Sequence, residues 1–116
     1  IMLDKKLTLK DLKSKVENFV NERDWEQFHD PKNLAMSISI EAAELMEIFQ
    51  WSSNDESSQK MDTKDSRIHA IEEIADILIY TIAFCNRNNI DISEAILDKL
   101  KKNKIKYPKD KFKGKY

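Results

Sequence analysis

Residues 40–51 constrain the fold more than any other stretch, because they have helical spacing but no all-polar face. They read IEAAELMEIFQW, so apolar residues occupy nearly every side of the helix and three glutamates interrupt them. A surface helix normally carries one apolar stripe, and carboxylates among apolar neighbours are costly unless something pairs with them. Residues 72–80, EEIADILIY, likewise combine acidic residues with an otherwise apolar helix. We therefore expect these two helices to face each other and to hold a cation.

The composition favours an all-α protein of one domain. One glycine and two prolines in 116 residues leave little turn material for a β-fold, and few residues alternate with period two. Helical spacing predicts helices over about 8–23, 31–51, 66–88 and 93–108. The polar residues 52–66 are expected to form a mobile loop with room for one short helical turn. Four helices with mostly short connections predict an antiparallel four-helix bundle over residues 1–108, followed by a flexible basic tail at 109–116.

Several residues mark the expected helix ends. Thr8 is predicted to cap the first helix, Asp30 followed by Pro31 the second, and Ser93 the fourth. Asn88 and Asn89 suit a left-handed stop after the third helix in a chain that has almost no glycine. On the fourth helix, the apolar residues expected to point inward are Ile96, Leu97, Leu100 and Ile105.

The two most apolar helices carry more apolar surface than one small bundle can cover. Residues 31–51 and 74–84 are apolar around almost the full circle. This excess predicts a tight homo-oligomer, either a homodimer or a homotetramer built as a dimer of dimers, with these helices at the interface.

Charge is distributed unevenly along the chain. Residues 30–98 carry a net charge of −9, and residues 99–116 carry +8. A basic end could bind nucleic acid, or it could help an acidic metal site to hold a polyphosphate. For the last eight residues we prefer a solvated, frayed end.

Cys85 stands alone in an apolar helical stretch. It cannot form an internal disulfide and is expected to be buried and reduced. Together with the lack of a recognisable signal peptide, and of an apolar run near the ~20 residues of a membrane span, this predicts a cytoplasmic protein.

The acidic residues fall into two matched pairs. Glu41 and Glu44 lie three residues apart on one helix face, and Glu73 and Asp76 repeat that spacing. Four carboxylates packed together repel each other, and a divalent cation removes that penalty. Oxygen ligands without cysteine or paired histidine favour magnesium or manganese over zinc.

Two other interpretations of the acids are less favoured. They could be solvent-facing residues with lysine partners, but these helices offer few solvated positions. A ferritin-like di-iron bundle would need two Glu-x-x-His pairs, and the one forward match, at Glu26 and His29, falls in a turn.

Taken together, the acidic pairs and their flanking segments resemble a known family. The segments are RDWEQFH at 23–29, PKNL at 31–34, ELMEIFQW at 44–51, EIADILIY at 73–80 and KYP at 106–108. They are similar to the all-α nucleoside triphosphate pyrophosphohydrolases, the MazG-like group, and within it to the dCTP pyrophosphatase branch. The resemblance covers roughly residues 20–108.

The resemblance implies magnesium-dependent hydrolysis of a nucleoside triphosphate, dCTP or a modified dCTP, to the monophosphate and pyrophosphate, a house-cleaning reaction of the nucleotide pool. It implies that the metal is held by Glu41, Glu44, Glu73 and Asp76. One of the glutamates, Glu41 or Glu44, would orient the attacking water. Substrate-binding positions implied by the match are Trp25, Trp51, Tyr80, Lys99 and Asn103, with Lys99 on a phosphate.

Three alternatives for function stay open at this point. Without the resemblance, Trp25 and Trp51 would be interpreted as core or interface residues. The enzyme could act on dUTP or damaged nucleotides, because base choice depends on a few pocket contacts. The chain could also be a non-catalytic helical oligomer that binds a protein or nucleic acid partner.

Overall fold

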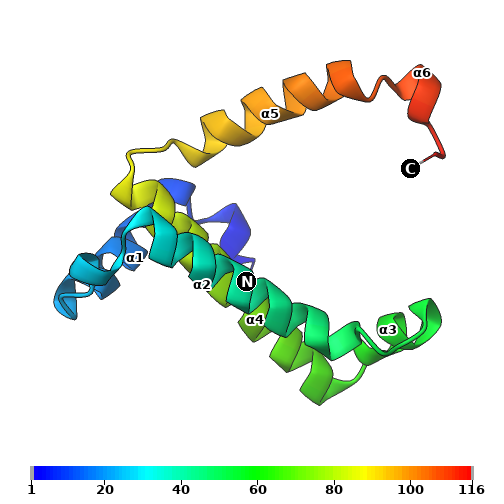
Figure 1. Ribbon diagram of the computed structural model, residues 1–116, viewed down its shortest axis with the longest axis horizontal. Helices are drawn as coiled ribbons and strands as arrows, with labels where there is room; N and C mark the ends of the chain where they lie inside the picture. Colours follow the sequence, from blue (N-terminus) through cyan, green and yellow to red (C-terminus); the bar gives the residue numbers. More distant parts are fainter. Residues whose placement is uncertain (1, 116) are drawn as a thin grey trace.

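The computed structural model describes residues 2–115, and every element within them is helical (Figure 1). The elements are η1 (Leu3–Lys5), α1 (Leu9–Glu22), η2 (Glu26–Phe28), α2 (Pro31–Phe49), α3 (Asn54–Lys60), α4 (Lys64–Arg87), α5 (Ile92–Lys106) and α6 (Lys109–Phe112). The expected all-helical class is confirmed. Among the described helices, none is both long enough and apolar enough to cross a membrane.

Local capping chemistry sets the starts of α1 and α2 as expected. The Thr8 hydroxyl accepts from the Asp11 amide at 3.1 Å, and the Asp11 carboxylate accepts from the Thr8 amide at 2.9 Å. The Asp30 carboxylate accepts from the Asn33 amide at 2.8 Å, and Pro31 occupies the first position of α2. After α4, Asn89 adopts a φ of 55°, which confirms the predicted left-handed stop.

The cap of α5 differs from the prediction. Asp91, not Ser93, precedes the helix, and its carboxylate accepts from the Glu94 amide at 2.8 Å. Both residue types cap helices well, but the carboxylate also complements the positive end of the helix. The helix therefore begins with Ile92, two residues earlier than a cap at Ser93 would allow.

The segment expected as a loop contains the seven-residue helix α3. Ser53 and Glu56 close a capping box at its start, with distances of 3.2 and 3.4 Å. At its end, the Lys60 ammonium donates to the Ile48 carbonyl at 2.7 Å. This bond ties α3 to the last turn of α2.

The core lies between α2 and α4, which run antiparallel side by side, with α1 packed on α4 (Figure 1). Leu34 of α2 is the most buried large side chain described, with 1% of its surface exposed. From α4, the buried residues include Ala70, Ile82, Ala83 and Cys85. The predicted burial of Cys85 is confirmed, and its thiol is free.

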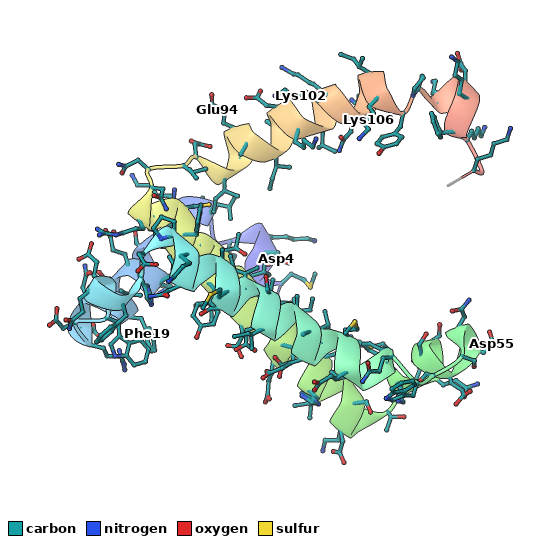
Figure 2. All side chains as sticks on the ribbon, in the orientation of Figure 1. Asp4, Phe19, Asp55, Glu94, Lys102 and Lys106 are labelled. Atoms are coloured by element: carbon teal, nitrogen blue, oxygen red, sulfur yellow. The ribbon has the colours of Figure 1, made fainter. Side chains whose placement is uncertain are left out.

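Helix α5 extends away from the α2–α4 pair (Figure 1). In Figure 2, Lys102 and Lys106 lie on this arm, far from Phe19 at the end of α1. The radius of gyration is 17.1 Å, against about 13 Å for a compact domain of this length. The predicted inward stripe on α5 is wrong for a single chain, because its side chains are 49–82% exposed: Ile96, Leu97, Leu100 and Ile105. The four-helix bundle itself stays a prediction.

The chain end carries more structure than a frayed tail. Residues 109–112 form α6, and the Phe112 ring packs edge-to-face on Tyr107 with centroids 5.3 Å apart. The domain boundary at 108 remains a prediction.

Candidate metal and nucleotide site

Three of the four predicted acidic residues of α2 and α4 lie close together. Glu41 of α2 and Glu73 and Asp76 of α4 each offer a carboxylate oxygen, and these oxygens lie within 4.8 Å of one another. The antiparallel pairing of the two helices brings together residues that are 32 positions apart in the sequence. We call these three residues the acidic cluster.

Two carboxylate oxygens of the acidic cluster are buried without a partner. Oε2 of Glu41 and Oε2 of Glu73 accept no hydrogen bond from the described residues. The other oxygen of Glu73 lies 3.3 Å from Nε2 of His69, one turn earlier on α4. Because buried polar atoms normally have partners, these two oxygens are suited to binding a cation.

The electrostatics of the acidic cluster also indicate a cation site. The adjacent Glu73 carboxyl group, burial, and the nearby charges of Glu44 and Asp76 raise the pKa of Glu41 to about 7. Without a cation, Glu41 is therefore only about half ionised at pH 7. Three carboxylates, two of them with a buried oxygen that has no partner, and no sulfur or paired histidine suit a hard divalent cation, so the residues present fit a metal ion of that kind.

Glu44 stands beside the acidic cluster but outside its closest group. It lies almost one turn after Glu41, is partly buried, and is near enough for its charge to raise the pKa of Glu41. Glu47, three residues further along α2, is exposed.

An aromatic hollow adjoins the acidic cluster. Trp25, Tyr80 and Asp76 line it together, and its space, including the open mouth, is about 660 Å³. The Trp25 ring packs edge-to-face on Phe19 with centroids 5.6 Å apart and keeps 43% of its surface exposed. Aromatic faces beside carboxylates could hold a base at one end and a metal-bound polyphosphate at the other.

The structure does not bring the other three expected residues to this place in a single chain. Trp51 follows α2 and is 89% exposed. Lys99 and Asn103 lie on α5, which extends away from the acidic cluster (Figure 1).

The sequence reasoning did not single out His29, which lines the hollow as well. Burial lowers the pKa of His29, although the charge of Glu26 opposes this shift. The sequence offered one indication that His29 belongs to the site. His29 directly precedes Asp30, the cap of α2, and the turn before this cap packs against α4. The other wall residues missed are apolar and carry no chemical signal: Phe19, Val20, Ile79 and Ala83.

Comparison with known proteins identifies the family. Residues 36–115 match the MazG-like family. The chain is 39% identical to dCTP pyrophosphatase 1 of Mus musculus over 101 residues, which are 87% of this chain and 59% of that protein. It is also 39% identical to the Homo sapiens protein of the same name, with the same coverage. The chain therefore belongs to the MazG-like family and spans about three fifths of these mammalian relatives' length.

A solved structure is similar as well. The crystal structure of a pyrophosphatase from Archaeoglobus fulgidus superposes with a TM-score of 0.81 at 44% sequence identity. The match covers 85% of this chain and 91% of that one.

Proposed function

We propose that this chain is a metal-dependent nucleoside triphosphate pyrophosphohydrolase, a hydrolase acting on phosphorus anhydrides. The observation that carries the proposal is Asp76, which belongs to the acidic cluster and also lines the aromatic hollow. A cation site and a base-sized aromatic wall are thereby contiguous. The names of the relatives, dCTP pyrophosphatase and pyrophosphatase, support the same reaction.

The acidic cluster would hold magnesium, or manganese in its place, with Glu44 as a fourth ligand or neighbour. A divalent cation supplies neutralisation of the triphosphate charge and polarisation of the phosphorus under attack. Glu41, Glu73 and Asp76 fix its position from two packed helices, so little reorganisation is needed when substrate binds.

Glu44 suits the task of orienting the attacking water. It stands next to the acidic cluster without belonging to its closest group, so its carboxylate is available to accept a proton from water. Water attack with departure of pyrophosphate leaves the nucleoside monophosphate. Glu41 is the other candidate for this role, since it belongs to the same acidic cluster.

Trp25 and Tyr80 would contact the base and sugar in the hollow. The substrate we favour is dCTP or a modified dCTP, because the relatives with 39% identity carry that name. dUTP and damaged nucleotides are the alternatives, and the substrate panel described below separates them.

We infer further that the working form is a homodimer or homotetramer. The exposed apolar stripe of α5 and the large radius of gyration support this, since a single chain leaves α5 without a packing partner. Lys99 and Asn103 can approach an acidic cluster only if α5 packs against another copy. The alternative of a non-catalytic helical oligomer would leave the orphaned carboxylate oxygens unexplained.

The test is pyrophosphate release from a panel of nucleoside triphosphates with and without magnesium. The variant Asp76→Asn should lose turnover while keeping the oligomer, because it removes one carboxylate common to both parts of the site. Glu72→Gln is the matched control on the same helix, since Glu72 is exposed and outside the acidic cluster. Equal magnesium-dependent turnover in both variants would rule the proposal out.

A further inference from the structure

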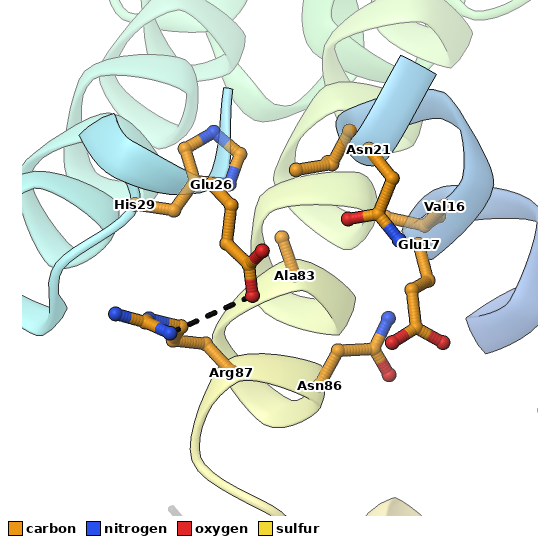
Figure 3. Close-up of a pocket in the computed structure, with 9 residues that line it drawn as sticks. Val16, Glu17, Asn21, Glu26, His29, Ala83, Asn86 and Arg87 are labelled. Atoms are coloured by element: carbon orange, nitrogen blue, oxygen red, sulfur yellow. Dashed lines mark ion pairs between the residues drawn. The ribbon is translucent and has the colours of Figure 1, made fainter. Parts of the chain in front are cut away.

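His69 of α4 contacts the acidic cluster, although it lies outside both this cluster and the aromatic hollow. Its Nε2 is 3.3 Å from Oε1 of Glu73, one turn further along the helix. Among residues 2–115, two other contacts join a basic side chain to a carboxylate: Arg23 with Glu22, and Arg87 with Glu26 near the end of α4 (Figure 3). Within that range, Glu73 is therefore the one member of the acidic cluster with a basic partner.

The two oxygens of the Glu73 carboxylate lie in different surroundings. The residue as a whole is buried, with 8% of its surface exposed. Oε1 lies beside His69, whereas Oε2 is buried without a partner among the described residues. The contact with Oε1 requires the ring hydrogen to be on Nε2, because two bare acceptors would repel each other. With Oε1 occupied by the ring, Oε2 is the oxygen of Glu73 that remains for a cation.

The number of oxygens that one carboxylate gives to a cation separates magnesium from calcium. Magnesium demands nearly ideal octahedral geometry with oxygens at about 2.0–2.1 Å, whereas calcium accepts longer distances and both oxygens of one carboxylate. The two oxygens of a single carboxylate are too close together to fill neighbouring octahedral positions well. A carboxylate that has one free oxygen therefore favours the smaller ion.

We propose that His69 is a positioning residue that restricts Glu73 to one-oxygen ligation and thereby sets a preference of the site for Mg²⁺ over Ca²⁺. This inference rests on the metal site of the proposed function and names a determinant of its ion selectivity. The His69 side chain is 56% exposed, so its contact with Glu73, and not a place in the core, is its tie to the site. Without the ring, Oε1 is free to turn to the cation together with Oε2, an arrangement that suits calcium better than magnesium.

The test is competition for bound Mn²⁺ in the full chain. Free Mn²⁺ is measured by electron paramagnetic resonance while Mg²⁺ or Ca²⁺ is added to displace the bound ion. His69→Leu removes the ring nitrogen, so the ratio of the two displacement constants should shift toward Ca²⁺ by about tenfold, the lower end of what the loss of a ligand's outer partner costs in metal affinity. His69→Gln should keep the preference for Mg²⁺, because its amide nitrogen can take the place of Nε2 and donate to Oε1.

Glu72→Gln is the matched control for these variants. Glu72 is exposed, directly precedes Glu73 and lies outside the acidic cluster. The substitution removes a charge near the site without touching the His69 contact, so it should change the affinities for both ions alike and leave their ratio as in the wild type. Equal weakening of both ions in His69→Leu, or a His69→Gln variant that behaves like His69→Leu, would overturn this inference.

Pyrophosphate release, measured on the same preparations, tests the proposed function separately. A wild-type chain that binds Mn²⁺ but turns over no nucleotide would overturn the proposed enzyme, and the displacement ratio would still decide the role of His69. A wild-type chain that binds no Mn²⁺ would overturn both.

Discussion

Magnesium binding should take a proton from the acidic cluster near neutral pH. An ordinary glutamate is ionised well below pH 7, but the pKa of Glu41 is about 7 in the metal-free protein. Metal ligation requires the carboxylate form, so binding must displace this proton. At pH 7 the expected release is about half a proton per site.

The same pKa sets the pH dependence of affinity. The ionised fraction of Glu41 is about one tenth at pH 6, one half at pH 7 and nine tenths at pH 8. Apparent magnesium affinity should follow this fraction, rising about fivefold from pH 6 to pH 7 and less than twofold from pH 7 to pH 8. Stability of the metal-free protein runs the other way: the raised pKa favours the fold at low pH, and this contribution is lost as the pH rises from about 4.5 through 7.

Calorimetric titration of magnesium in two buffers with different ionisation enthalpies measures both the affinity and the proton release. Glu41→Gln should bind more weakly and release no proton at pH 7. Glu47→Gln, an exposed neighbour on the same helix, should behave as the wild type. A wild-type affinity that is flat between pH 6 and 8, with no proton released, would refute this account of the acidic cluster.

Three further predictions concern the core, the apolar stripe of α5 and Trp51. Leu34→Ala should destabilise the fold by about 2–5 kcal/mol in urea unfolding, because Leu34 is almost fully buried between α2 and its neighbours. Leu97→Lys should shift the protein to a smaller species in light scattering, since it places a charge in the exposed apolar stripe of α5; a wild-type chain that is already monomeric contradicts this. Trp51→Ala should raise the half-saturation concentration of the nucleotide more than it lowers turnover in steady-state kinetics, and an unchanged value would remove Trp51 from the substrate contacts.

Features that depend on neighbours in the sequence could be predicted well. The caps by Thr8 and Asp30 act within three residues, so a few side chains decide them. The missed cap at Asp91 belongs to the same class of interaction. Two good capping residues stood within one turn, and the choice between them depends on where the chain leaves α4, which no local pattern contains.

The acidic cluster could be predicted in outline because helical spacing fixes which residues share a face. Glu73 and Asp76 met Glu41 as expected. The weaker involvement of Glu44 could not be foreseen, because residues three apart on a helix differ by about 60° in direction. Which member of the pair approaches the partner helix depends on how α2 and α4 are rotated against each other.

The position of α5 could not be predicted from the sequence. The apolar stripe of α5 indicates that another surface covers this helix. The stripe alone does not distinguish packing on helices of the same chain from packing on another copy. The backbone turns at Asn89, and α5 extends away from the α2–α4 pair (Figure 1).

In the proposed oligomer, assembly and metal binding would be coupled through α2. On this helix, Met36 and Ile40 are more than half exposed, and Ile40 directly precedes Glu41. A second copy that covers these residues would fix the rotation of α2 and so the direction of the Glu41 carboxylate. Because the cluster places like charges close together, an α2 that can rotate would relieve their repulsion by turning Glu41 away. The apolar excess of α2 would then serve the site as well as the proposed interface, which would explain why one helix carries both features.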